Sequence, residues 1–179
     1  MEDRELIIIL KDPERKNYGF NLLVQKYQAK IYWHIRRLVI DHEDADDLVQ
    51  DTFIRVFKNL ESFRQDSKLY TWIYRIATNV SLTHLSSKKR KFFLPIVDVN
   101  TSLISSLDQS TLVTEDEIMK KLHKALLKLP EKQRLVFNMK YFDDLKYEDI
   151  SEITGTSVGA LKASYHLAVK KIEDYLNNN

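Results

Sequence analysis

Apolar residues recur at three- and four-residue steps along most of the chain, a period that predicts helices rather than strands. The clearest stripe covers residues 44–63, and the opposite side of this helix is polar except for Ile54. Asp44 is expected to cap the helix, with Asp46 and Asp47 in the first turn, where the helix dipole favours carboxylates. The apolar positions of the stripe are Leu48, Val49, Phe53, Val56, Phe57, Leu60 and Phe63.

A second amphipathic helix is expected from about Leu69, after the polar segment RQDSK. Its apolar side consists of Trp72, Ile73, Ile76, Ala77 and Val80. The other side mixes aromatic, cationic and amide groups, and the pattern does not require its burial. Rings stack on unpaired bases, and Arg and Asn side chains bond to base edges or phosphates, so this side suits single-stranded nucleic acid. Its members are Thr71, Tyr74, Arg75, Thr78 and Asn79.

Two helices are expected before this pair. Residues 2–10 form a short one, ended by Asp12-Pro13, and residues 18–40 form a longer one. The apolar positions of the longer helix are Phe20, Val24, Tyr27, Ile31, Ile35 and Leu38. Residues 1–90 are therefore predicted to fold as a bundle of three or four helices.

The helical pattern changes near Ser86, where the segment SSKKRK begins. Residues 91–113 are rich in Ser, Thr, Asp and Asn and show no clear periodicity, which predicts a flexible linker. The apolar segment FFLPIV is the exception within it and is a candidate for docking on another part of the protein.

A second helical domain is predicted over residues 114–179. Thr114 and Glu117 have the spacing of a capping box. Pro130 is expected to end one helix and to open the next in its first turn. The two apolar stripes on either side of it are Ile118, Leu122, Ala125, Leu126 and Leu129, and then Leu135, Val136, Met139 and Phe142.

The last third of this domain has the pattern of a helix-turn-helix motif. Gly155 lies where a left-handed turn is needed, and the second helix should begin near Ser157. Its core positions are Ile150, Ile153, Val158 and Leu161. The predicted fold class is therefore all-α, with two small helical domains joined by a flexible linker.

Composition narrows the possible functions. The chain of 179 residues has only three Gly and three Pro, which agrees with a mostly helical fold, and it has no Cys, which excludes disulfides and thiolate metal sites. The formal net charge is only +2, so nucleic-acid binding must be argued from local patches. The apolar runs are too short to span a bilayer, and we expect no membrane insertion and a cytoplasmic location.

Neither catalysis nor metal binding is predicted. Six acidic residues crowd positions 41–51. Helix capping with solvation, or a protein-binding face, explains them better than a metal site, because no calcium-loop spacing is present. The five His residues are scattered, and no nucleophile motif or phosphate-binding Gly loop occurs, so no cofactor is expected.

Two stretches carry a family resemblance. DADDLVQDTF, the FR loop and YTWIYRIATN resemble region 2 of the bacterial RNA polymerase sigma factors of the extracytoplasmic-function (ECF) subfamily. LPEKQRLVFNMKYFDDLKYEDISEI, with the helix-turn-helix after it, resembles region 4 of the same family. The order of the two is the family's order. The resemblance implies a non-enzymatic factor that directs core RNA polymerase to promoters and helps to melt them.

The resemblance also implies roles for residues. The partners implied are core RNA polymerase, through its β′ clamp and β subunits, promoter DNA, and an anti-sigma factor. The face toward the β′ clamp is Asp47, Gln50, Asp51 and Arg55. The −10 element would be read and melted by Phe63, Arg64, Lys68, Tyr70, Tyr74, Arg75 and Asn79, with phosphate neutralisation by the basic residues Lys88, Lys89 and Arg90. The −35 element would be read in the major groove by Ser157, Gly159, Ala160, Lys162, Ala163, Ser164, His166 and Lys170.

The sequence departs from the family in the recognition helix. ECF factors commonly carry several Arg there, whereas this chain has Ser164, Leu167 and Val169. Weak phosphate anchoring is therefore expected. Lys162 and His166 are the remaining polar side chains that are long enough to reach the DNA. Lys146 also stands where a Ser or Thr cap is usual.

Two other classes of function remain open from the sequence alone. One is a helix-turn-helix regulator that binds duplex DNA without polymerase, and the other is a protein-interaction module that binds no DNA. A regulator that binds only duplex DNA has no use for the face of Asp47, Gln50 and Asp51. It equally has no use for the face of Tyr74, Arg75 and Asn79. These faces therefore favour the sigma-factor interpretation.

Overall fold

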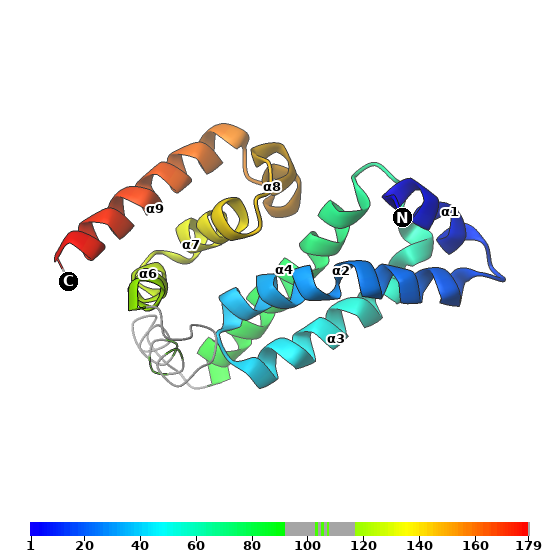
Figure 1. Ribbon diagram of the computed structural model, residues 1–179, viewed down its shortest axis with the longest axis horizontal. Coiled ribbons are helices and arrows are strands. Elements are labelled where there is room, and N and C mark those ends of the chain that lie inside the picture. The colour runs from blue at the N-terminus through cyan, green and yellow to red at the C-terminus, as the bar shows by residue number, and fades with distance from the viewer. Residues whose placement is uncertain (92–102, 104, 106, 108–116, 179) are drawn as a thin grey trace.

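A computed structural model describes residues 1–91, Leu103, Ser105, Leu107 and residues 117–178. The described parts fold into two groups of helices that lie side by side (Figure 1). The first group consists of α1 (Asp3–Lys11), α2 (Lys16–Val39), α3 (His42–Asn59), the 3₁₀ turn η1 (Leu60–Ser62) and α4 (Leu69–Lys91). The second consists of α6 (Glu117–Leu127), α7 (Glu131–Phe137), the π-helical turn η2 (Asn138–Phe142), α8 (Tyr147–Thr154) and α9 (Val158–Asn178).

Helix α2 is the centre of the first group and packs against α1, α3 and α4. Ile31 and Ile35 are fully buried on it, as predicted. Leu23 is also fully buried, whereas Phe20 and Val24 are only half-buried, because α1 covers the Leu23 side of the first turns. The all-α bundle expected for this part of the chain is confirmed.

Two predicted helix ends were wrong. The N-cap of α3 is Asp41, whose side chain accepts a hydrogen bond from the backbone N of Asp44 at 2.9 Å. Asp44 is thereby inside the first turn, and its carboxylate accepts from Lys88 and lies 3.2 Å from His84 on α4. Helix α4 does not end near Ser86 but continues to Lys91. This contact with the end of α4 explains part of the acidic cluster without any metal.

The second group contains the predicted helix-turn-helix. Gly155 ends α8 in the left-handed region, with φ 70°, where a residue with a Cβ is strained. Ser157 accepts a hydrogen bond from the backbone N of Ala160 at 3.3 Å and so caps α9. Lys146 makes no side-chain cap for α8, as its residue type predicts.

Other expectations for this group need correction. Ile118 was placed in the apolar stripe of α6 but is 72% exposed. Pro130 takes the N-cap position of α7 rather than its first turn. The proposed Thr114 cap and the segment FFLPIV lie outside the described residues. The domain limits 1–90, 91–113 and 114–179 stay a prediction.

Apolar side chains join the two groups. The main hydrophobic cluster includes Ile73 and Ala77 of α4 together with Ile150 and Ile153 of α8, and α4 packs against α8. A smaller cluster brings Leu103 and Leu107 against Ile40 and Leu127. The chain therefore buries α4 from both sides, with α2 and α3 on one and α8 on the other.

Candidate polymerase and nucleic-acid interfaces

The outer face of α3 is open to solvent. Asp47, Gln50 and Arg55 are exposed, and Asp51 is half-buried and pairs with Arg55 at 3.1 Å. Ile54 is 52% exposed at the centre of this face. An exposed apolar residue with a polar surround is typical of a protein–protein contact.

A groove runs beside this face, between α2 and α3. It has a volume of about 530 Å³ and is lined by Phe20, Gln50, Phe53, Ile54 and Phe57, among others. Phe20 and Phe57 meet edge to face at 4.9 Å between ring centroids. The groove and the exposed Ile54 together offer a partner an apolar slot next to the predicted polar contacts.

The first −10 candidates, which lie in the loop before α4, differ in how far they are buried. Phe63 is 9% exposed and packs on Trp72, with ring centroids 4.9 Å apart, so it serves the core. Arg64 and Lys68 are exposed. Gln65 between them is also exposed and has φ 62°, in the left-handed region.

The polar side of α4 is mostly covered, contrary to the accessible face that the pattern allowed. Thr71, Tyr74 and Thr78 are buried, Arg75 is half-buried and Asn79 is exposed. Thr78 Oγ1 lies 2.9 Å from His34 Nε2, and the Tyr74 ring lies 4.9 Å from the His34 ring. Burial raises the pKa of the Tyr74 hydroxyl, as does the nearby carboxylate of Asp143.

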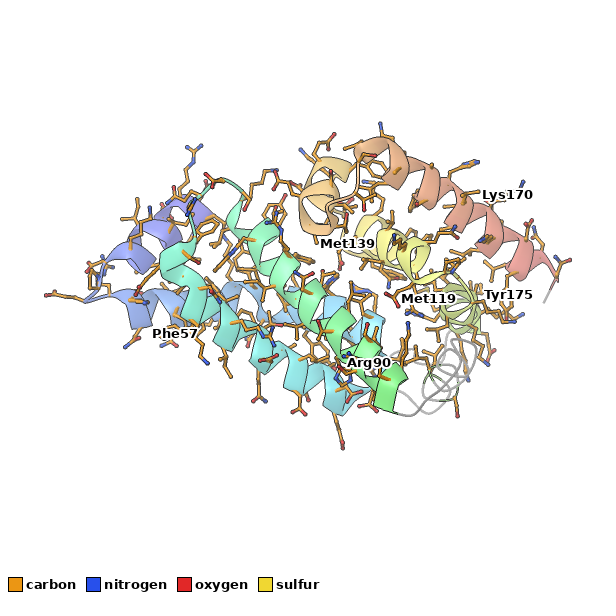
Figure 2. The ribbon with its side chains drawn as sticks, turned by 180° about the vertical axis from the view of Figure 1, so that it is seen from behind. Phe57, Arg90, Met119, Met139, Lys170 and Tyr175 are labelled. Carbon is orange, nitrogen blue, oxygen red and sulfur yellow. The ribbon has the colours of Figure 1, made fainter. Side chains whose placement is uncertain are left out.

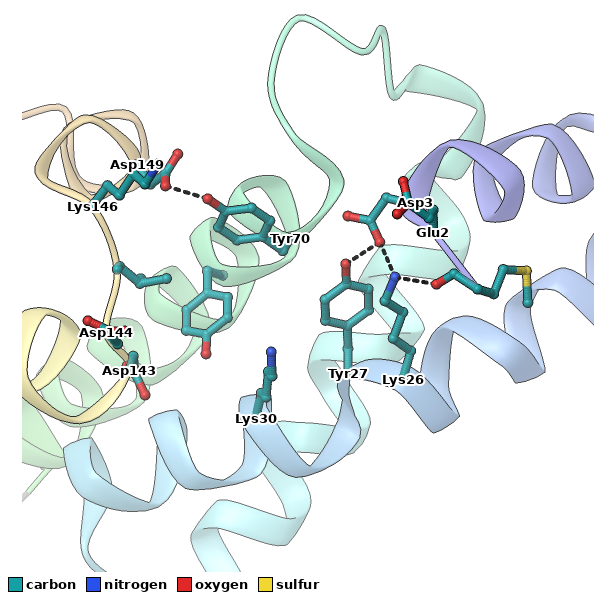
Figure 3. Close-up of a pocket in the computed structure, with 13 residues that line it drawn as sticks. Glu2, Asp3, Lys26, Tyr27, Lys30, Tyr70, Asp143, Asp144, Lys146 and Asp149 are labelled. Carbon is teal, nitrogen blue, oxygen red and sulfur yellow. Dashed lines mark hydrogen bonds and ion pairs between the residues drawn. The ribbon is translucent and has the colours of Figure 1, made fainter.

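Tyr70 and Lys68 both contact the carboxylate of Asp149 in the second domain, and Figure 3 shows the contact of Tyr70. The Tyr70 hydroxyl donates to Asp149, and Lys68 Nζ donates to the other oxygen of the same carboxylate at 2.9 Å. Burial and the hydrogen bond to Asp149 raise the pKa of Tyr70, and the hydrogen bond to Asp149 raises that of Lys68. The structure thus brings together two predicted −10 residues, but around an acidic side chain.

The basic end of α4 adds cations to the same helix. Lys88 pairs with Asp44 of α3, and Lys89 pairs with Glu131 at 2.7 Å. Arg90 is exposed. Asn79, Lys89 and Arg90 line a shallow groove of about 670 Å³ along α4. This groove places an amide and two cations along one path, as a single strand requires.

The −35 candidates lie on the open side of α9. Ser157, Gly159, Ala160, Lys162, Ala163, His166 and Lys170 are exposed, and Ser164 is half-buried. Lys170 lies far from Phe57 of α3 (Figure 2). Lys162 Nζ stands over the Tyr147 ring, 5.8 Å from its centroid. The residues Gly159, Ala160 and Ala163 at the start of α9 are therefore both small and exposed.

Four residues of this region were not singled out by the sequence. His34 and Arg37 of α2 both contact Asp143, at 2.8 and 3.1 Å, and Asp149 contacts α4. No local pattern marks them, because their partners lie 79 to 109 residues away. What distinguishes these residues is that their charges are buried, and burial cannot be recognised from the order of residues along the chain.

Among residues 1–91 and 117–178, no cluster of three His, Asp or Glu side chains could hold a metal ion. Within the same residues, no helix has the length and apolarity needed to cross a membrane.

Two family models match the chain, in the order of its two helical groups. Sigma-70 region 2 matches residues 23–91, and Sigma-70, region 4 matches residues 119–172. The RNA polymerase sigma-H factor of Pseudomonas aeruginosa is 32% identical over 185 residues, which covers 98% of this chain and 94% of that protein. The chain therefore belongs to the sigma-70 family of RNA polymerase sigma factors.

Other relatives place it in the ECF subfamily. The ECF RNA polymerase sigma factor SigW of Bacillus subtilis is 33% identical over 156 residues, covering 83% of each chain. The ECF RNA polymerase sigma-E factor of Escherichia coli is 30% identical over 184 residues, covering 97% of this chain and 94% of that protein.

Solved structures share the fold. CnrH in complex with the cytosolic domain of CnrY has a TM-score of 0.70 at 21% identity and covers 99% of this chain and 98% of that one. RpoE in complex with the anti-sigma factor NepR from Bartonella quintana has a TM-score of 0.70 at 21% identity, covering 88% and 96%.

Proposed function

We propose that this sigma factor binds core RNA polymerase through α3, reads and melts the −10 element through α4 and its preceding loop, and reads the −35 element through α9. It acts without catalysis of its own. The observation that carries the proposal is the arrangement of three distinct surfaces on two helical groups. The α3 face, the α4 groove and the α9 face belong to different helices, so polymerase and two promoter elements need not compete for one surface.

The α3 face suits the β′ clamp. Ile54 and the neighbouring groove supply buried apolar area, while Asp47, Gln50 and Asp51 supply orientation through polar contacts. A regulator that binds only duplex DNA would have no need for an exposed Ile at the centre of an acidic face. This observation favours a sigma factor over the other two classes of function.

The α4 groove suits the displaced promoter strand. Asn79 can hydrogen-bond a base edge, and Lys89 and Arg90 can neutralise phosphates along the same groove. Phe63 and Tyr74, by contrast, support this surface through packing, because both are buried. We therefore expect these two residues to support the −10 surface without touching the DNA.

An anti-sigma factor is a further partner that we propose. The solved structure of RpoE described above is that of a sigma factor in complex with an anti-sigma factor. The apolar groove between α2 and α3 and the exposed Ile54 form a surface on which a helix of such a protein could pack.

Run-off transcription tests the function. Core RNA polymerase, the full chain and the DNA upstream of its own gene are combined, and transcripts are compared with those from core alone. The expected result is a discrete transcript that needs the full chain. Sequence-specific duplex binding without polymerase, together with no transcript, would instead support a regulator that acts alone.

A further inference from the structure

A cavity of about 730 Å³ opens between α2, α4 and the segment 143–149 that leads into α8 (Figure 3). Its volume is typical of a site that holds a small ligand. A second cavity of about 250 Å³ adjoins it, because Lys30, Tyr74 and Asp143 line both. The two cavities together therefore have room for a ligand that consists of two chemically different parts.

The larger cavity carries cations that are not used by the fold. The carboxylates of Asp3, Asp143 and Asp149 each pair with neighbouring side chains. The ammonium groups of Lys30 and Lys146, by contrast, have no hydrogen-bond or ion-pair partner within the part of the chain that the structure describes. Lys30 enters from α2 and Lys146 from the start of α8 (Figure 3). Two such cations on one cavity favour an anionic ligand that both can contact.

Tyr74 lines both cavities, and its hydroxyl also lacks a partner. The residue is only 3% exposed, yet the hydroxyl makes no hydrogen bond to any residue among those described. A buried hydroxyl without a partner is costly, and folded proteins rarely leave one in that state. Burial raises the pKa of this hydroxyl, so it stays protonated and can donate a hydrogen bond. It is a third donor for the same anion.

The smaller cavity is aromatic. Trp33, Phe142 and Tyr74 line it, and Trp33 is 46% exposed. The Arg37 guanidinium covers the Phe142 ring at 4.9 Å from the ring centroid, whereas the Trp33 ring keeps an open surface. Exposed aromatic rings are stacking surfaces for planar ligands. The smaller cavity therefore suits a planar ring beside the anion site.

We propose that the two cavities bind a nucleotide, with its phosphates at Lys30, Lys146 and Tyr74 and its base on Trp33. A nucleotide joins a planar ring to a multiply charged anion, which is the combination that the adjoining cavities offer. The exposed carboxylate of Asp144 lines the larger cavity and can accept from the hydroxyl groups of the sugar. Because both helical groups contribute to the lining, a bound nucleotide stabilises the folded chain.

Titration of the full chain with ATP and with GTP tests the site. The chain has only two Trp residues, so Trp72→Phe leaves Trp33 as the single Trp fluorophore. Stacking of a base should quench Trp33 fluorescence. Thermal unfolding measures the stabilisation independently, since a ligand that binds only the folded chain raises Tm. Inorganic phosphate and a single-stranded oligonucleotide are titrated in parallel.

Two variants remove single contacts of the site. Lys30→Gln and Tyr74→Phe should each raise Kd about tenfold, a usual effect of one lost hydrogen bond to a charged group. Tyr74→Phe keeps the buried ring and removes a hydroxyl that has no partner, so the fold should be retained. The controls Lys11→Gln and Tyr18→Phe change exposed side chains of the same kinds outside both cavities and should bind like the parent.

Several outcomes would overturn the proposal. One is the absence of both quenching and thermal stabilisation with either nucleotide, and another is stabilisation without quenching, because the base would then not lie on Trp33. Equal affinity for inorganic phosphate would show that the ring contributes nothing. Parental affinity in both Lys30→Gln and Tyr74→Phe would place the nucleotide elsewhere.

The oligonucleotide separates a free nucleotide from a DNA strand as the source of the same chemistry. If it quenches Trp33 at lower concentration than either nucleotide, and Lys30→Gln weakens this effect, the cavities belong to a strand and the proposal fails. The titration contains neither polymerase nor promoter, so its result does not depend on the run-off assay.

Discussion

His34 and Asp143 form a buried pair across the two domains, with His34 Nδ1 2.8 Å from Asp143 Oδ2. Thr78 donates its hydroxyl hydrogen to the Tyr74 carbonyl at 2.7 Å, so His34 Nε2 must donate to Thr78 Oγ1 at 2.9 Å. The other ring nitrogen faces the Asp143 carboxylate. Each nitrogen of the buried His34 ring therefore has a hydrogen-bond partner, Thr78 on one side and Asp143 of the second domain on the other.

Removal of this ring should destabilise the folded chain. His34→Leu leaves Asp143 buried with Arg37 as its remaining partner, and loss of one member of a buried pair costs about 3 kcal/mol. Urea unfolding followed by circular dichroism measures it. The control His166→Leu changes an exposed ring of α9 and should stay within about 0.5 kcal/mol of the parent. Equal effects of the two variants would contradict the pair's importance.

Charge reversal on α3 should weaken polymerase binding. Asp51→Lys breaks the pair with Arg55 and puts a cation beside Gln50 on the proposed clamp-binding face. A contact of this kind typically contributes more than ~1 kcal/mol to binding. A pull-down measures the binding of core polymerase to the variant. The helicity of the variant should equal that of the parent. Glu14→Lys reverses an exposed charge in the turn between α1 and α2 and should bind like the parent. Parental binding by Asp51→Lys would remove this face from the polymerase interface.

Substitutions on α4 should separate melting from packing. Asn79→Ala is expected to spare polymerase binding and to reduce open complexes, since Asn79 is exposed on the strand groove. Permanganate footprinting measures it, and a pre-melted template should restore activity. Gln25→Ala, which truncates an exposed amide side chain of α2, is the control. Tyr74→Ala should instead destabilise the fold by about 3 kcal/mol, because Tyr74 is buried.

An added cation on α9 should strengthen promoter binding without sharpening its specificity. Leu167 is 47% exposed, so Leu167→Arg can reach a phosphate without disturbing the core. The slope of log affinity against log salt should steepen by roughly 0.9 per phosphate neutralised. Holoenzyme is titrated with the cognate and a scrambled −35 duplex over a salt series, with Asn177→Arg at the far end of α9 as the control. A gain limited to the cognate duplex would contradict the placement of this face.

Acid should weaken the packing of α6. Burial, with Arg37 and Arg36 nearby, lowers the pKa of His123 to about 4, from an unfolded value near 6.5. The unfolded chain therefore binds the proton more tightly, and His123 contributes stability that is complete above about pH 6.5 and lost as pH falls toward 4.

A change from pH 7.5 to 5 should cost the parent roughly 2 kcal/mol through His123 alone. His123→Phe keeps the ring that stacks on Phe142 and removes this titration. Unfolding of parent and variant is compared at both pH values, so that carboxylates common to both cancel. Equal losses in the two proteins would show that His123 is not buried as the structure has it.

The helices themselves follow from the sequence, because their periodicity and end signals are local. Gly155 and Ser157 mark the turn and the start of α9, as predicted, since each acts on backbone atoms within a few residues. The outward face of α3 also follows, because a single stripe of Leu48, Phe53 and Val56 leaves only one side to bury. The cap is Asp41 rather than Asp44, three residues earlier. Both belong to the same acidic segment at the start of α3, so the segment marked the helix start but not the capping residue.

Tertiary structure alone decided which side of α4 is accessible. A helix with one apolar and one mixed side can bury both when a second domain covers it, and Tyr74 and Thr78 are buried in this way. The pairs of Asp143 with His34 and of Asp149 with Tyr70 join residues 109 and 79 positions apart. Pairs of opposite charges that lie so far apart along the chain leave no repeating pattern in the sequence. They exist only once the domains pack, because burial makes each of these charges require a partner.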